Sequence, residues 1–144
     1  MIEIPIISKR FDVPDYATIG SSGVDIRADI QDVLVIPPHE TRLVPTSFYV
    51  AIPEGYELQI RSRSGLALKH GIVVAQGIGT IDSDYRGELG VILLNTSNSE
   101  FAVIPGEKIA QMVLAKCEKI QWRFANNLPS TDRGEGGFGS TGIK

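Results

Sequence analysis

The sequence predicts an all-β fold, a barrel or a sandwich of short strands. Apolar and polar residues alternate over many short segments, which is the period of a strand and not of a helix. Turns rich in Pro and Gly separate these segments, and only one stretch has the features of a helix. With 144 residues, 42% of them hydrophobic, the chain is long enough for one domain with its own core.

The strand pattern is clearest in the first half of the chain. From Gly23 to Ile30 apolar residues alternate strictly with charged ones, which predicts a strand with one buried face. The apolar side comprises Val24, Ile26, Ala28 and Ile30. Shorter strands are expected over residues 1–8, 33–36, 43–44, 48–52 and 56–61.

The expected helix opens the second half and runs from Ser64 to His70, with Ser64 as its N-cap and Gly71 as its stop. Strands are expected after it over residues 72–75, 91–94, 101–104 and 109–115. Between them, residues 77–95 place a polar centre between two apolar runs. This pattern predicts a tight hairpin that carries carboxylates and a tyrosine to a pocket, although an Asp- and Gly-rich surface turn explains the stretch better when it is taken alone.

The C-terminal stretch, residues 126–144, differs from the rest of the chain. Five glycines fall between Arg133 and Gly142, and Phe138 is its one aromatic residue. Such a segment cannot form a core, so we expect a core over residues 1–125 and a mobile arm or lid after it. Cys117, the single cysteine, lies in an apolar run and is expected to be a buried, inert thiol.

The composition excludes several classes of function. A net charge of −3 provides no basic face for a nucleic acid. No apolar stretch is long enough to cross a membrane, and the first residues have no signal-peptide pattern, so a soluble protein of the cytoplasm is expected. A zinc site is not expected, because His, Cys and carboxylates do not cluster at ligand spacing.

Five segments contain more Gly, Ser, Arg, Asp and Gln than a β-fold requires. They are residues 23–25, 63–67, 77–95, 106–111 and 133–142. In this order they resemble the five motifs of the trimeric dUTP nucleotidohydrolases (dUTPases), spread over nearly the whole chain. Ser62 stands where that family usually has Pro, and Gln76 where many members have Asn. We expect the first departure to alter the backbone without loss of chemistry, and the second to change the pocket edge slightly.

The resemblance implies a fold, an assembly and a reaction. The fold would be a jelly-roll-like distorted barrel, assembled as a homotrimer with exchanged C-terminal segments. The reaction would convert dUTP to dUMP and pyrophosphate with Mg²⁺, which limits uracil in DNA and supplies dUMP for dTMP synthesis. Each site would take the first, second and fourth motifs from one subunit, the central hairpin from a second and the glycine-rich tail from a third.

The resemblance also gives roles to individual residues. Asp82 would activate the attacking water, since a carboxylate can orient water and accept its proton as the new bond forms. Spacing alone does not separate Asp82 from Asp84, which also fits a turn-forming role. Asp25 would reach Mg²⁺ through water and not directly. The substrate-binding residues would be Arg63, Ser64, Gly65, Gln76, Gly79, Thr80, Ile81, Tyr85, Gln111, Arg133, Phe138, Gly139, Ser140 and Thr141.

Each group of these residues would bind a different part of the substrate. Arg63, Ser64 and Gln111 would contact phosphates, and backbone groups from Ile78 to Ile81 would recognise uracil. Tyr85 would exclude a 2′-hydroxyl, although it also fits an ordinary core tyrosine. In the tail, Phe138 would stack on the uracil and Arg133 would pair with the terminal phosphate.

Two alternatives stay open at this point. A dCTP deaminase-like enzyme would share the fold and release ammonia, although residues 82–85 and the tail argue against it. A nucleotide-gated regulatory protein would instead act by contacting another protein.

Overall fold

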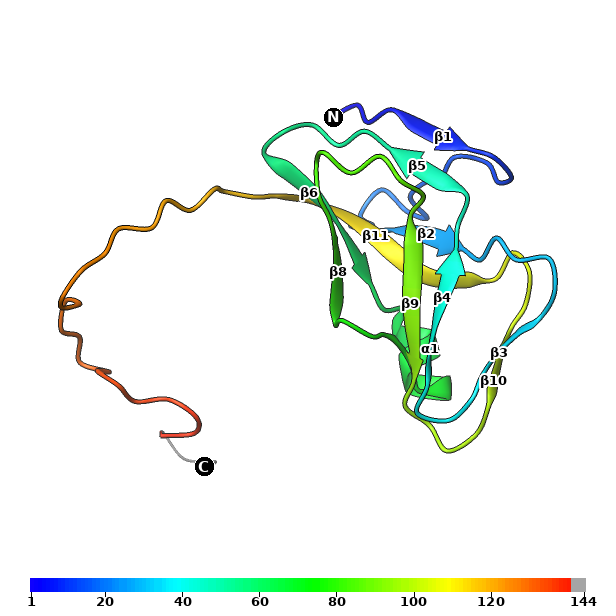
Figure 1. Cartoon of the computed structure of the whole chain (residues 1–144). Helices are drawn as coiled ribbons and strands as arrows, with labels where there is room; N and C mark the ends of the chain where they lie inside the picture. The colour runs from blue at the N-terminus through cyan, green and yellow to red at the C-terminus, as the bar shows by residue number, and fades with distance from the viewer. Residues whose placement is uncertain (141–144) are drawn as a thin grey trace.

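A computed structural model describes residues 1–140 and shows eleven strands and one short helix (Figure 1). Thr141, expected to bind the substrate, lies outside the described residues. The elements are β1 (Ile6–Ser8), β2 (Val24–Arg27), β3 (Leu34–Ile36), β4 (Thr41–Pro45), β5 (Phe48–Val50), β6 (Tyr56–Arg61), α1 (Ser64–His70), β7 (Ile72–Val74), β8 (Ile78–Ile81), β9 (Gly90–Asn95), β10 (Phe101–Val103) and β11 (Lys108–Lys116). The predicted all-β class is confirmed.

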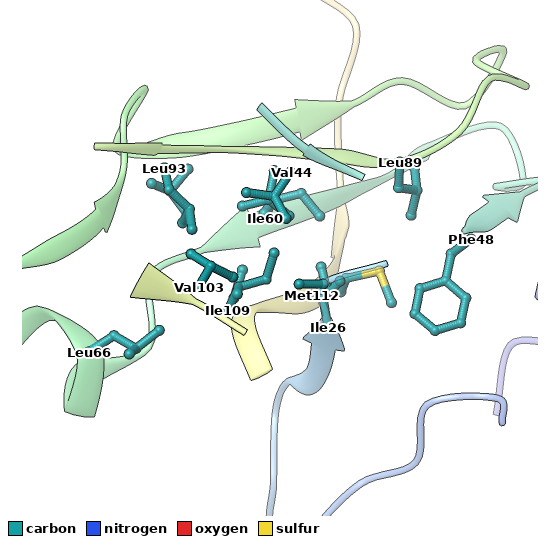
Figure 2. Packing of buried hydrophobic residues seen from close by; sticks show 14 of the residues in the cluster. Ile26, Val44, Phe48, Ile60, Leu66, Leu89, Leu93, Val103, Ile109 and Met112 are labelled. Atoms are coloured by element: carbon teal, nitrogen blue, oxygen red, sulfur yellow. The ribbon is translucent and has the colours of Figure 1, made fainter. Parts of the chain in front are cut away.

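The strands form two larger sheets and two small ones, and every pairing is antiparallel. The larger sheets have the strand orders β2-β11-β6-β8 and β4-β9-β7. Figure 2 shows Val44 and Leu93 of the second sheet pointing toward Ile109 and Met112 of the first, with all four side chains buried. The core therefore lies between two sheets, as in a jelly roll.

The alternation in the first half of the chain is confirmed. Ile26 and Ala28 are 0% exposed, whereas Arg27 between them is exposed. The observed strand is shorter than residues 23–30, because its partner β11 pairs only with residues 24–27. Asp25 is half-buried on the face of β2 that points away from the core.

The helix has the predicted bounds but a different cap. Arg63 is the N-cap, in an extended conformation and without a side-chain cap bond. The prediction that Ser64 caps the helix is therefore wrong, since Ser64 is already the first helical residue. Gly71 ends the helix as predicted: its φ of 67° is left-handed, and its N–H donates to the Ala67 carbonyl at 3.1 Å.

The predicted tight hairpin around Asp82 is wrong. β8 pairs with β6 in the four-stranded sheet, while β9 pairs with β4 and β7 in the other sheet. Residues 82–89 therefore cross from one sheet to the other. Leu89 holds the end of this connection away from β8. Its side chain is 0% exposed, and its N–H donates to the Phe48 carbonyl at 2.8 Å. The end of the connection is thus fixed to β5 and not to β8.

Beyond β11 the chain leaves the body as an extended segment (Figure 1). Trp122 and Phe124 are 85% and 106% exposed there. Cys117, at the start of this segment, is only half-buried, so the expectation of a buried thiol is wrong. The reason is that the strand ends at Lys116, one residue earlier. Within residues 1–140 there is no helix with the length and apolar character that crossing a membrane requires.

Candidate active site

Residues from three of the five motif segments meet in a cluster of charged side chains at one end of the four-stranded sheet. Asp25 on β2 accepts hydrogen bonds from Arg63 Nε at 2.9 Å and from Lys108 Nζ at 2.7 Å. Arg63 Nη1 also donates to the Lys108 carbonyl at 3.1 Å. We call Asp25, Arg63, Lys108 and the adjacent Gln111 the cation cluster.

Asp25 is ionised at neutral pH. Partial burial alone raises the pKa of its carboxyl group. The hydrogen bond from Lys108 and the positive charges of Arg63 and Lys108 outweigh this effect, so the pKa lies below the usual value. Asp25 therefore supplies a stable negative charge that holds two cationic side chains in place.

Gln111 is held in a defined orientation. Its Nε2 donates to the Ser62 carbonyl at 3.0 Å, which satisfies a half-buried amide as its position in an apolar strand requires. Its Oε1 lies toward Gly23, where an added Cβ would approach it to 2.6 Å. Gly23 is therefore needed for this orientation. Ser64 and Gly65, which follow Arg63, are exposed beside the cluster.

A second group of predicted residues lies along β8 and the connection after it. β8 is an edge strand of its sheet. Gly79 is buried, and an added Cβ would lie 3.2 Å from Ile60 Cβ and 3.7 Å from Gln76 Nε2. A hollow of about 290 Å³ is lined by Thr80, Ile81, Asp82, Tyr85 and Glu88, among others. We call it the β8 hollow.

The structure distinguishes the two neighbouring aspartates. Asp82 is exposed and lines both the β8 hollow and a larger hollow of about 560 Å³, while Asp84 lines the larger one. Tyr85 is 43% exposed, and its hydroxyl donates to the Glu88 carbonyl at 2.9 Å. Tyr85 is therefore a pocket residue of this chain and not a core tyrosine.

These two groups do not meet within one chain. Leu58 pairs with Ile81 and Arg61 with Ile78, so Asp82 lies near the Tyr56 end of β6 and Arg63 lies past the other end. Because a strand rises about 3.3 Å per residue, the length of β6 separates them by roughly 15–20 Å. Figure 1 shows the same separation, with the 82–89 connection at the opposite end of the sheet from α1.

The glycine-rich tail is also separate from both groups. Arg133 Nε donates to the Gly136 carbonyl at 2.7 Å, and Ser140 N donates to the Gly137 carbonyl at 3.0 Å. Phe138 is 114% exposed, with Gly139 after it in a left-handed conformation. In Figure 1 this segment lies away from the body of the same chain.

Two residues of this region were not predicted from the sequence. Lys108 reaches Asp25 because the strand register shifts between Lys108 and Ala110, and such a bulge has no clear signal in an alternating pattern. Glu88 accepts hydrogen bonds from the backbone N–H groups of Ser47 at 2.7 Å and Thr46 at 3.2 Å. A lone Glu that follows a glycine gives no indication of such a role.

The oxygen atoms of Asp25 fit a water-mediated contact to Mg²⁺. Both carboxylate oxygens are already paired with cations, yet each keeps lone pairs that can accept a hydrogen bond from water. Within residues 1–140 no group of three or more His, Cys, Asp or Glu residues is arranged to hold a metal ion. The remaining lone pairs of Asp25 suit contact with the water shell of an ion that phosphates carry, as Mg²⁺ often is.

The cation cluster suits phosphates and the β8 hollow suits a small ring, so fold and site together define a nucleotide-binding class of β-protein. Comparison with known proteins makes this specific: the chain belongs to the dUTPase family, whose model matches residues 9–142.

Relatives and solved structures agree with this family. A deoxyuridine 5′-triphosphate nucleotidohydrolase of Orientia tsutsugamushi (strain Ikeda) is 52% identical over 92% of this chain and 89% of its own length. One from Finegoldia magna is 49% identical over 98% of this chain and 99% of its own. The solved dUTPase of Staphylococcus bacteriophage 80alpha with dUpNHpp is 26% identical, with a TM-score of 0.87 over 99% of this chain and 100% of that one.

Proposed function

We propose that the protein is a dUTP diphosphatase in which Asp82 activates the water that attacks the α-phosphorus of dUTP. The products are dUMP and pyrophosphate. Family membership over residues 9–142 supports the reaction, and two nucleotidohydrolase relatives near 50% identity support the substrate. The position of Asp82 on the β8 hollow supports its role. The expected place of action, the cytoplasm, stays a prediction.

The chemical step needs a positioned water and a proton acceptor. The Asp82 carboxylate would hold the water and accept its proton as the new oxygen–phosphorus bond forms. The bond from the α-phosphorus to the oxygen that bridges to the β-phosphorus would break, and pyrophosphate would leave with that electron pair. Because Asp82 is exposed at the rim of a hollow, water and substrate can reach it.

The phosphates would bind at the cation cluster. Arg63 uses Nε and Nη1 within the chain, and a guanidinium has five N–H donors, so others remain for phosphate oxygens. Ser64 and Gln111 would add a hydroxyl and an amide. Mg²⁺ bound to the phosphates would neutralise charge that develops on the leaving group. Asp25 would contact the water shell of that ion and keep Arg63 oriented.

The complete site would need more than one copy of the chain. Asp82 and Arg63 lie at opposite ends of β6, so a water held by Asp82 cannot reach a phosphorus held at Arg63 of the same chain. The homotrimer with exchanged C-terminal segments implied by the family would place Asp82 of one chain near Arg63 of another. The exposed Trp122 and Phe124 of the extended segment also favour cover by a neighbouring copy, since burial of apolar side chains is favourable.

The base and sugar would bind along β8. As an edge strand, β8 has backbone groups that can recognise uracil, and the absence of a Cβ at Gly79 lets its backbone lie close to Ile60. Tyr85 would lie against the deoxyribose and leave no space for a 2′-hydroxyl. Residues 126–144 would close over a neighbour's site, where Phe138 stacks on the uracil and Arg133 pairs with the terminal phosphate.

A matched pair of substitutions tests the proposal. Asp82→Asn should lower kcat at least ~100-fold, the usual contribution of a general base, while dUTP binding changes little. Asp84→Asn is the control, because it removes an equivalent charge two residues away and should retain most of the activity. Normal turnover by Asp82→Asn together with an inactive Asp84→Asn would show that the assignment is wrong.

A further inference from the structure

Ser62 joins the phosphate-binding and base-binding parts of the chain. It lies between β6 and Arg63, and it is half-buried. Its carbonyl accepts the hydrogen bond from Gln111 Nε2 at 3.0 Å. Its side-chain Oγ accepts a hydrogen bond from the backbone N–H of Val74 at 2.8 Å. A single residue thus contacts both the cation cluster and the end of β7.

The hydrogen bond from the Val74 N–H to the Ser62 hydroxyl fixes the turn that leads into β8. Ala75 N–H donates across to the Ile92 carbonyl of β9, so strand alternation directs the Val74 N–H to the opposite edge, where Ser62 lies. The Val74 carbonyl accepts from Gly77 N–H at 3.0 Å and closes the turn. β8 begins at the next residue, Ile78, which pairs with Arg61.

We propose that Ser62 is a positioning residue for the uracil pocket: its hydroxyl holds the Val74–Gly77 turn and thereby sets the position of β8. This inference rests on the proposed function, since it takes β8 as the base-binding strand. A side chain without a hydroxyl, Pro included, would leave the Val74 N–H without this acceptor. In the shared-site arrangement, the Val74–Gly77 turn and the cation cluster of one chain belong to two different sites. Because every chain carries the same substitution at Ser62, the uracil pocket changes in every site.

The test compares ligands that report on the two parts of the site. Ser62→Ala should weaken dUMP binding about two- to tenfold, the usual effect of one lost hydrogen bond, and raise the KM for dUTP by a similar factor. The affinity for pyrophosphate in magnesium buffer and kcat should stay within about twofold of wild type, because Arg63 and Asp82 are retained. Ser62→Thr, which keeps the hydroxyl, should restore dUMP binding.

Thr96→Val is the matched control. It also removes a hydroxyl that bonds to the backbone, since Thr96 Oγ1 donates to the Gly71 carbonyl at 2.8 Å, but it does so at the end of α1 and not at the turn. It should leave dUMP and pyrophosphate binding unchanged. If Ser62→Ala does not fold, Ser62→Cys, whose thiol is a weaker acceptor, must show the same selective loss.

Two outcomes overturn the inference. One is a Ser62→Ala protein with wild-type affinity for dUMP, and the other is a loss that falls equally on dUMP and pyrophosphate. Both outcomes overturn the inference only if the wild-type protein in the same experiment hydrolyses dUTP. A wild-type protein without that activity would instead overturn the proposed function, so the two failures are distinguishable.

Discussion

Glu88 should determine both the stability of the 82–89 connection and the selectivity of the sugar pocket. Its Oε1 accepts hydrogen bonds from the backbone N–H groups of Thr46 and Ser47, and its carbonyl accepts from the Tyr85 hydroxyl. Hydrogen bonds to a charged group contribute about 1.5–3 kcal/mol each. Because Glu88 is only half-buried and the Thr46 bond is long at 3.2 Å, we expect about 2–4 kcal/mol for Glu88→Ala.

This loss is measurable by thermal unfolding. For a chain of this size about 1 kcal/mol corresponds to roughly 2–4 °C, so the Tm should fall by about 5–15 °C. Glu88→Gln keeps a carbonyl acceptor and should lose less than half as much. The released connection should also let Tyr85 move, so UTP hydrolysis should rise relative to dUTP hydrolysis.

Glu40→Ala provides the comparison for Glu88→Ala. Glu40 makes an exposed ion pair with Arg42 at 2.7 Å, and such pairs contribute only about 0–1 kcal/mol. Its removal should leave both the Tm and the ratio of the two activities nearly unchanged. Equal Tm values for Glu88→Ala and Glu40→Ala would refute the reasoning about the connection.

Three further predictions concern single residues. Tyr85→Ala should raise kcat/KM for UTP relative to dUTP, and an unchanged ratio would place the ribose filter elsewhere. Ser47→Gly should raise the Tm, because Ser47 has a left-handed φ of 58° and its buried Oγ has no hydrogen-bond partner within residues 1–140. Glycine costs more backbone entropy on folding, so we expect the free energy of unfolding to rise by about 1–2 kcal/mol in total. The folded protein lowers the pKa of Asp25 below its usual value near 3.8, because the carboxylate is paired with Arg63 and Lys108. These pairs should therefore stabilise the fold fully above pH 3.8, and this stabilisation should be lost as the pH falls through the lower pKa of the folded state. An Asp25→Asn protein should lack this part of the acid-induced loss in a pH titration of stability; an unchanged titration would contradict the pairing.

The sequence predicts faces and boundaries better than partners. Alternation correctly identified the buried side of β2, and a glycine correctly marked the end of α1. The pairing of β8 was not predictable, because period-two alternation shows which face is buried but not which strand lies alongside. The prediction of a hairpin failed for this reason.

The site was predictable only in part, for a related reason. The motif segments contain Asp25, Arg63 and Gln111, which the fold does bring together. Lys108 reaches Asp25 through a register shift, and Ser62 acts through one hydroxyl bond to Val74. Such contacts depend on the positions of individual atoms, which residue type and spacing do not fix.

The central claim is that the site combines Asp82 of one chain with Arg63 of another. The direct test mixes two inactive variants, Asp82→Asn and Arg63→Gln, by refolding them together in equal amounts. In randomly mixed trimers some sites receive an intact Asp82 and an intact Arg63, so the mixture should recover about a quarter of the activity of wild type treated in the same way. A mixture that stays as inactive as its two components, although the chains have exchanged, would contradict the claim.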